Sequence, residues 1–235
     1  MNDVAIYQVD RVELNVVPWS WPFAVERRRD IDAYFAQLQR RSPGVWNGRV
    51  LLMHRFLFEQ GTLNGVLFEA DYASLLAGLE WGAVGESVKS CFGVAALVSA
   101  DGAFIVGQMG RHTVNAGKVL FPSGSIEPAD VSGGKVDLYS NVLRELEEET
   151  GLTDKDFGVG PGWSVAFDGP HIPIFKVMRA KETAEKLQVF IQTNLAAQVQ
   201  PEFCDIRIVR TPSDLDARMP AWMRAFIADG IVRRT

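Results

Sequence analysis

Cysteine is scarce in this chain, and its scarcity excludes one class of protein. Cys91 and Cys204 are the two cysteines among 235 residues, so a fold held together by several disulfides is excluded. We interpret both as reduced, small structural residues of the core. The sequence also lacks a basic segment followed by an apolar one near its start, and it has no apolar run of about 18 residues. These absences argue against a membrane span and favour a soluble, cytoplasmic protein.

Positive charge is not in excess either. Lys and Arg total 24 against 29 Asp and Glu, which gives a formal net charge of -5. This balance gives no electrostatic reason to expect a nucleic acid or a membrane as partner. A nucleotide remains compatible with the acidity, because a divalent cation can mediate between carboxylates and phosphates. The three histidines lie far apart in the sequence and show no metal-ligand spacing.

The composition is typical of a globular protein. Hydrophobic residues make up 47% of the chain, charged residues 23% and aromatic residues 10%, which excludes a disordered chain. The length suits a core of about 150 residues with a smaller extension. We therefore predict an N-terminal α+β extension over residues 1–89 and a main α/β domain over residues 90–235.

The extension has clear secondary-structure signals. Alternating apolar and polar residues indicate a half-buried strand, and apolar residues at helical spacing indicate a helix. Two apolar runs separated by a turn containing Gly61 predict a hairpin. In chain order, we expect a strand from residue 11, a helix over 30–40, a hairpin of 49–58 with 62–69, and a helix capped by Asp71 that ends near 79.

The main domain alternates strands with a few helices, which predicts a mixed sheet between helix layers. Residues 122–135 are rich in Gly and Pro and are expected to form a loop. A helix should follow, with Asp137 as its N-cap and Gly151 just after its last turn. The other expected elements are strands at 92–98, 103–109, 118–121, 163–167, 172–177 and 206–209, and helices at 182–197 and 220–228.

One segment of the predicted helix has the chemistry of a metal site. Glu145, Glu148 and Glu149 share one face, because residues three and four apart on a helix are neighbours. Crowded carboxylates repel one another unless a cation is present, and their hard oxygens suit Mg²⁺ or Mn²⁺. Arg144 lies four residues before Glu148 and can orient a carboxylate. Glu147 points elsewhere and is expected to be solvated.

A solvated acidic face is the alternative interpretation, and a run of glutamates alone would favour it. The complete string is more specific. The pattern from Arg144 to Leu152 is Arg, Glu, apolar, any, Glu, Glu, any, Gly, apolar. It should arise by chance in roughly one in 10⁴ to 10⁵ chains of this length at average residue usage. Its position at a helix end, after a Pro/Gly loop, further favours a functional site.

This segment resembles the signature of the Nudix hydrolases. Residues Arg144 to Leu152 match its second half completely. In the first half, the 121–124 segment resembles the family's Pro-Gly-Gly loop, with Ser123 in place of one glycine. Gly124 followed by five residues reaches Asp130, where the family has Glu. Thirteen residues then separate Asp130 from Arg144 instead of seven, so we expect the six extra residues to form a mobile surface excursion.

The resemblance implies an α/β/α sandwich with a mixed sheet, in which the signature forms a loop, a helix and a second loop. It also implies hydrolysis of a nucleoside diphosphate linked to another moiety, with Mg²⁺ or Mn²⁺ as cofactor. By position in the signature, the implied metal ligands are Glu145, Glu148, Glu149 and the backbone carbonyl of Ser123. Arg144 matches the arginine that orients the glutamates, and Glu127 matches a glutamate often found in the loop.

The general base is left open by the sequence. Glu145 is one candidate, and Glu202 and Asp205, just before a predicted strand, are others. Arg111 follows another predicted strand and is a candidate for contacting phosphate or sugar. Ordinary turn residues remain the alternative for these last three positions.

Three functions compete at this stage. The first is an active Nudix diphosphatase, and the second is a non-catalytic Nudix-fold module that binds a nucleotide or a partner. The intact glutamate set favours the first. A Nudix isomerase would need a catalytic Cys and Glu pair, for which Cys91 and Cys204 show no local pattern. The extra N-terminal unit, its Trp46-Asn47-Gly48 segment and the lengthened loop loosely resemble the UDP-sugar diphosphatase branch. The sequence leaves open whether the chain forms a homodimer.

Overall fold

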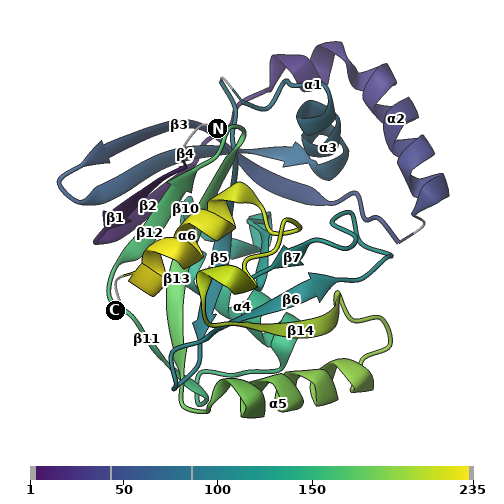
Figure 1. Cartoon of the computed structure of the whole chain (residues 1–235). Helices are drawn as coiled ribbons and strands as arrows, with labels where there is room; N and C mark the ends of the chain where they lie inside the picture. Colours follow the sequence, from purple (N-terminus) through teal and green to yellow (C-terminus); the bar gives the residue numbers. More distant parts are fainter. Residues whose placement is uncertain (1–3, 43, 86, 233–235) are drawn as a thin grey trace.

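The computed structural model describes residues 4–42, 44–85 and 87–232 and consists of two mixed β-sheets with six α-helices among those residues (Figure 1). The larger sheet has the order β1-β12-β13-β5-β6-β14, with β11, β8 and β7 paired to β13, β5 and β6. Its strands are β1 Ala5–Val9, β5 Ser90–Val98, β6 Phe104–Met109, β7 Val119–Leu120, β8 Ser123–Ser125, β11 Phe157–Val159, β12 Trp163–Phe167, β13 His171–Ala180 and β14 Phe203–Val209.

The smaller sheet has the order β3-β4-β2-β10-β9. Its strands are β2 Arg11–Val16, β3 Arg49–Glu59, β4 Thr62–Asp71, β9 Val131–Ser132 and β10 Lys135–Val136. The helices are α1 Pro22–Glu26, α2 Arg28–Arg41, α3 Tyr72–Glu80, α4 Leu138–Thr150, α5 Ala184–Ala197 and α6 Ala221–Val232, with short 3₁₀ turns η1 Pro128–Asp130 and η2 Pro212–Asp214. The sequence predicted most of the longer elements, but not α1, β1 or β11, nor the short strands β8, β9 and β10.

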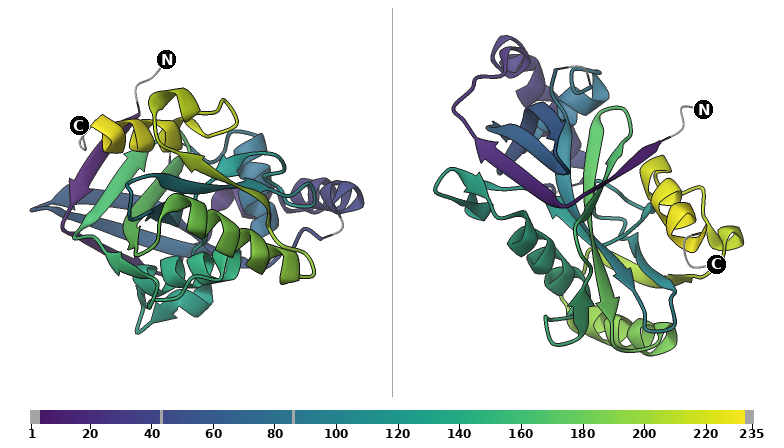
Figure 2. Two further views of the ribbon diagram at one scale, coloured as in Figure 1. Left: turned by 60° about the horizontal axis from the view of Figure 1, so that its bottom comes forward. Right: turned by 90° about the vertical axis from the view of Figure 1, so that its left-hand side faces the viewer.

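The larger sheet lies between helices on both faces, which confirms the predicted α/β sandwich (Figure 2). Successive residues of a strand point to opposite faces. The Phe92 ring of β5 packs against Trp222 of α6, with ring centroids 5.7 Å apart. A Cβ added to the next residue, Gly93, would lie 2.6 Å from Val142 of α4. Helices α6 and α4 therefore cover opposite faces of the central strand, and the core forms between them.

The predicted hairpin in the N-terminal part is confirmed. Strands β3 and β4 pair from Glu59 and Thr62 back to Arg49 and Asp71. The two turn residues between them, Gln60 and Gly61, have φ of 48° and 72°. Positive φ at both positions matches the right-handed twist of the paired strands, so this turn sets the register. Asp71 then caps α3 by accepting the backbone N–H of Ser74 at 2.9 Å, as predicted.

The two sheets exchange strands across residue 89. β1 comes from the N-terminal segment but pairs antiparallel with β12 in the larger sheet, from Ala5 opposite Phe167 to Val9 opposite Trp163. In the other direction, β10 adds to β2 of the smaller sheet. A shared hydrophobic cluster includes buried side chains from both segments. The division into residues 1–89 and 90–235 stays a prediction, and it is crossed by both strand pairing and core packing.

The predicted loop over residues 122–135 was wrong in detail, while the mobility of the six extra residues stays a prediction. Residues 123–125 pair with β5 as strand β8, and residues 131–136 form the small hairpin β9–β10. The hairpin is held to the smaller sheet by the Lys135–Asn15 pair and by the N–H of Val16, which donates to the carbonyl of Gly134 at 2.9 Å. The glycines at the tip of the hairpin, Gly133 and Gly134, led to the prediction of a loop. The segment forms strands because β10 pairs with the free edge of β2.

The position of this hairpin explains why thirteen residues, and not seven, separate Asp130 from Arg144. Its six residues are the six extra ones, and its base is closed by the N–H of Asp137, which donates to the carbonyl of Asp130 at 2.8 Å. Asp130 therefore lies beside the first turn of α4, where it would lie without the insertion. The alignment of Asp130 with the signature thus has a structural explanation.

Two further expectations concern the cysteines and a membrane span. Cys91 is buried, as expected, and burial raises the pKa of its thiol to about 12. Cys204 is exposed, so its assignment to the core was wrong. None of the helices in the described ranges combines the length and the apolarity needed to cross a lipid bilayer.

The closed hairpin base generates the first prediction. Deleting residues 131–136 should leave a folded protein, because the backbone ends to be joined are already within hydrogen-bond distance. The shared cluster would lose the apolar contacts of the half-buried Val131 and Val136. We expect this loss to lower the free energy of unfolding by about 1–2 kcal/mol and the Tm by roughly 2–8 °C. Calorimetry measures the shift. Loss of cooperative unfolding would contradict the view that the hairpin is an insertion.

Candidate active site

Helix α4 has the boundaries that its sequence predicts, and they fix the position of the glutamates. Asp137 caps the first turn by accepting the N–H of Ser140 at 3.0 Å. Gly151 ends the helix with φ of 76°, a conformation that other residues adopt only at a cost. Leu146 and Val142 are buried against the sheet. These anchors at both ends and along one face hold the carboxylates of the last two turns in place.

Glu149 is the most buried of these carboxylates. Its residue is 5% exposed, and one oxygen accepts the backbone N–H of Ser123 at 2.9 Å. Burial raises its pKa well above the ordinary value, and the charges of Glu202 and Glu145 add to the increase, while the hydrogen bond opposes it. A carboxylate held in an apolar environment near other carboxylates is stabilised by any cation that reaches it.

Glu145 lies over the signature loop. Its side chain is 13% exposed, and one oxygen is 2.7 Å from the Arg144 guanidinium. A Cβ added to Gly124 would lie 2.1–2.3 Å from its carboxyl atoms, so the carboxylate occupies the space that any side chain at position 124 would need. Burial raises the pKa of Glu145 to about 7, although Arg144 opposes the increase. This site explains why the loop needs glycine there.

The third predicted ligand, Glu148, differs from the other two. Its side chain is 60% exposed and lies 3.4 Å from Arg144. The predicted crowding of carboxylates therefore involves Glu145 and Glu149 in a largely buried position, while Glu148 reaches the same cluster from solvent. Glu147 is exposed, as predicted.

Asp130 supports the loop and the helix together. Its side chain is 7% exposed and accepts hydrogen bonds at 2.9 Å from the side-chain amide of Asn141 and from the N–H of Glu127. Its other oxygen is 3.5 Å from Arg144. Burial also raises the pKa of Glu127, which is close enough to Arg144 and Asp130 to feel their charges. Asp130 therefore positions Arg144, which in turn orients Glu145.

Glu202 joins the cluster from a distant part of the chain. Its backbone carbonyl accepts the N–H of Gly110 at 2.7 Å, which fixes the segment before β14 against the end of β6. Burial raises the pKa of Glu202, and its charge raises the pKa of Glu145 and of Glu149. Among the two late-loop acids that the sequence proposed, Glu202 is the one that reaches the glutamate helix.

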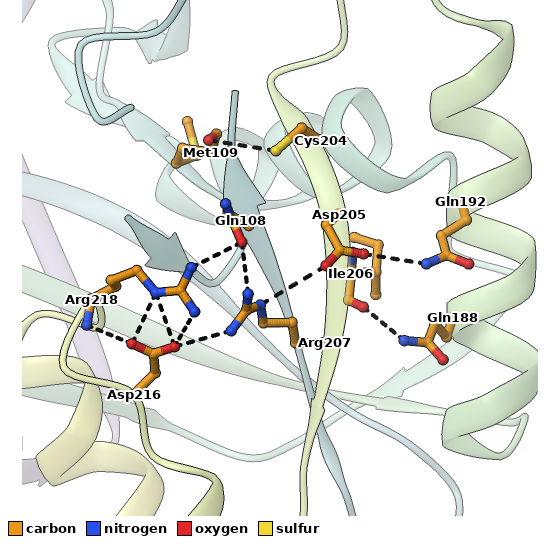
Figure 3. A network of polar contacts seen from close by, with 10 residues as sticks. All are labelled: Gln108, Met109, Gln188, Gln192, Cys204, Asp205, Ile206, Arg207, Asp216 and Arg218. Carbon is orange, nitrogen blue, oxygen red and sulfur yellow. Dashed lines mark hydrogen bonds and ion pairs between the residues drawn. The ribbon is translucent and has the colours of Figure 1, made fainter. Parts of the chain in front are cut away.

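Asp205 lies elsewhere. Its carboxylate accepts the N–H of Ile206 at 2.9 Å, and it contacts Gln192 of α5 and Arg207 (Figure 3). It belongs to a surface network that continues through Arg207 to Asp216. Its prediction as a general base is not supported by these contacts.

Arg111 is also separate from the carboxylates. It lies exposed in the turn after β6, and no contact joins it to a glutamate in the part of the chain that the structure describes. Its neighbour His112 is the closer residue, because its charge lowers the pKa of Glu202. The role of Arg111 as a contact for phosphate or sugar stays a prediction.

The N-terminal segment brings aromatic residues to this site that sequence reasoning did not assign to it. The charge of Glu202 contributes to the raised pKa of Tyr72, which burial raises to about 12. The half-exposed ring of Trp46 lies 6.2 Å from the Tyr72 ring. Asn47 holds this corner together by accepting the N–H of Ala73 at 2.8 Å. The Trp46-Asn47-Gly48 segment was the available signal, but no periodicity indicates which distant carboxylate it meets.

The donor set fits a hard divalent cation by its chemistry. Within the described ranges, no three Asp, Glu, His or Cys side chains converge in the geometry of a metal site. Glu145 and Glu149 are nevertheless desolvated carboxylates, the charge of Glu145 raises the pKa of Glu149, and the charge of Glu148 raises the pKa of both. Oxygen ligands of this kind suit Mg²⁺ or Mn²⁺. Which of these side chains bind the metal stays a prediction.

The close approach at Gly124 generates a second prediction. Gly124→Ala should displace the Glu145 carboxylate, because that carboxylate is the flexible group in the way of the new methyl. We expect the fold to survive and any activity or cation binding that depends on Glu145 to fall at least tenfold. Calorimetric titration with Mn²⁺ and a thermal melt measure both effects.

Gly158→Ala is the matched control, because nothing lies within 4 Å of its added Cβ. Equal cation affinity in both variants and in the wild type would show that Glu145 takes no part in binding.

Comparison with known proteins gives distant structural matches. No family model matches the chain, and no curated protein matches it. The MutT protein of Methanosarcina mazei Go1 is 21% identical, with 63% of this chain and 96% of that chain covered and a TM-score of 0.43. The NUDIX domain of Shewanella oneidensis NrtR complexed with ADP ribose is 17% identical, covering 69% and 97%, with a TM-score of 0.41.

A C. elegans Ap4A hydrolase is 11% identical, with 61% of this chain and 94% of that chain covered and a TM-score of 0.40. None of these three is described as a UDP-sugar diphosphatase, and the likeness to that branch stays a prediction. At such identities the function has to be argued from the site itself. The segment from Arg144 to Leu152 lies at the end of helix α4 and in the loop that follows, on an α/β/α sandwich, which is the arrangement that the resemblance implies.

Proposed function

We propose that this protein is a metal-dependent hydrolase that cleaves the pyrophosphate bond of a nucleoside diphosphate linked to another moiety. The observation that carries the proposal is the pair of buried carboxylates, Glu145 and Glu149, held over Gly124 and Ser123 of the signature loop. A solvated acidic face would not bury them. Burying charge without a compensating role is costly, and such perturbed carboxylates are typical of functional sites.

The residues present divide the work of such a reaction. Glu145, Glu148 and Glu149 would hold Mg²⁺ or Mn²⁺, together with the carbonyl of Ser123. The bound ion would neutralise the diphosphate and activate water. Arg144 keeps Glu145 oriented through the 2.7 Å contact, and the Ser123 N–H keeps Glu149 directed at the loop. Most of the protein's contribution is therefore the positioning of charge.

Glu202 is the best-placed general base. The residue keeps contact with solvent, but partial desolvation raises the pKa of its carboxyl group, and its charge acts on both Glu145 and Glu149. A raised pKa brings a carboxylate closer to the working pH, where proton transfer is most effective. Glu145 remains the second candidate for this step, since its pKa is also raised.

Tyr72 and Trp46 support a substrate with a planar or sugar-like group beyond the diphosphate. Both rings come from the N-terminal segment, and Tyr72 lies within electrostatic reach of Glu202. Aromatic faces bind nucleobases and sugars by stacking. The base and the linked moiety would be identified by a panel of nucleotide sugars, dinucleotides and nucleoside triphosphates, assayed with Mg²⁺ and with Mn²⁺.

The third prediction tests the metal cluster. Glu149→Gln keeps the shape of the side chain and its acceptor for the Ser123 N–H but removes the charge. We expect turnover on the best substrate of the panel to fall about 10²-fold or more, because transition-state charge would lose a main source of stabilisation. The Tm without metal should not fall, since repulsion among buried carboxylates is relieved.

Glu147→Gln is the control, because Glu147 is exposed on the same helix and should be nearly neutral. Full activity in both variants would leave the helix as an acidic surface. A wild type that binds members of the panel but cleaves none would instead favour the non-catalytic binding module.

The fourth prediction concerns pH. Glu202 must be ionised to accept a proton, and its raised pKa means that kcat at saturating metal should rise with pH above the range of an ordinary carboxyl group. Glu202→Gln should lower kcat by about 10²-fold or more and remove this rise, while leaving Mn²⁺ affinity near that of the wild type. The pH–rate profile measures it. An unchanged profile with reduced kcat would assign the base to another residue, with Glu145 next in order.

A further inference from the structure

The second half of β3 is an open sheet edge. β3 is the terminal strand of the smaller sheet and lies along the border of a projecting hairpin (Figure 1). Its first half is covered, because the N–H of Leu51 donates to Ile126 and Met53 bridges to Lys89. From residue 55 to residue 59, no strand pairs with its outer side in the described ranges. Backbone groups on such an edge are available to pair with another strand.

The side chains of this edge are apolar and exposed. Phe56 is 41%, Leu57 59% and Phe58 37% exposed, which is unusual for three successive large hydrophobic residues. On one face of the hairpin, Phe56 and Phe58 form an aromatic cluster with Tyr7 and Phe167, with ring centroids 5.1–5.8 Å apart. A hollow of about 480 Å³ adjoins the cluster. An exposed aromatic edge of this kind is an interaction surface or an aggregation hazard.

The charges that flank the apolar residues make this segment complementary to a second, antiparallel copy of itself. The segment reads Arg55, Phe56, Leu57, Phe58, Glu59, with a cation and an anion equally distant from Leu57. Neither Arg55 nor Glu59 has an ion pair within the described residues. In an antiparallel pair of identical strands centred on Leu57, Arg55 of each copy lies opposite Glu59 of the other. Phe56 lies opposite Phe58 in the same arrangement.

We propose that this edge is a homodimer interface, in which the β3 strands of two copies pair antiparallel about a two-fold axis at Leu57. The two five-stranded sheets then form one continuous sheet. Opposite charges directly across an antiparallel pair stabilise it, whereas like charges in those positions destabilise it. Each dimer contains the Arg55–Glu59 pair twice, because a two-fold interface repeats every contact. The free charges thus select the second copy over an unspecified apolar partner.

The experiment is a charge swap followed by mass in solution. Sedimentation velocity or light scattering should give a dimer for the wild type. Arg55→Glu and Glu59→Arg should each weaken the dimer at least tenfold, since each places two pairs of like charges opposite one another. The double variant Arg55→Glu with Glu59→Arg should restore it. Both positions are exposed, and a thermal melt checks that each variant is folded.

A cysteine cross-link tests the register, in a Cys204→Ser background because Cys204 is exposed. Leu57→Cys should form a disulfide between copies on oxidation, since residue 57 faces itself across the axis. Asn64→Cys is the matched control: Asn64 pairs with Leu57 on β4, so two copies would lie about 14 Å apart, three strand spacings, and should not cross-link.

A wild type that stays monomeric up to about 100 μM would overturn the proposal. A dimer that neither single charge reversal weakens, or that the double variant does not restore, would overturn it as well, because its interface would lie on another face. These outcomes are independent of the proposed hydrolase activity.

Discussion

The contact on which the site depends is the burial of the Glu149 carboxylate against the backbone N–H of Ser123. A buried anion with one neutral donor is not fully compensated, so the surrounding groups must keep it in place. The apolar face of α4 fixes the helix, the glycine at position 124 leaves room for Glu145, and Arg144 balances part of the charge. The loop and the helix of the signature therefore form one electrostatic unit, which Glu202 joins although β11, β12, β13 and α5 separate it from α4 in the sequence.

The N-terminal segment contributes to the larger sheet and to the surroundings of the carboxylates. β1 of the N-terminal segment forms the edge of the larger sheet. The inserted hairpin β9–β10, which comes from the main domain, extends the smaller sheet beside β2. Tyr72 feels the charge of Glu202 from the start of α3. The base of the hairpin, closed by the hydrogen bond between Asp137 and Asp130, thus connects the smaller sheet to the start of the glutamate helix.

Local signals in the sequence were sufficient for the elements that depend on local chemistry. The cap at Asp137, the end at Gly151 and the hairpin turn at Gly61 follow from side-chain hydrogen bonding and positive φ, and all three were confirmed. The approach of Glu202 to α4 depends on tertiary packing, which no periodicity encodes. The insertion was read as a loop from its glycines, because the pairing of Lys135 with Asn15 depends on a strand 120 residues earlier.

Ser123 contributes its backbone N–H to the site, and this determines which substitutions the loop tolerates at that position. Ser123 does not have positive φ, so its conformation does not require glycine. The group that Glu149 needs from this position is an amide hydrogen, which every amino acid except proline supplies. Serine in place of the first glycine of the Pro-Gly-Gly pattern is therefore a neutral variation, whereas the neighbouring position 124 admits no side chain without moving Glu145. Two adjacent residues of one loop thus face opposite mutational constraints.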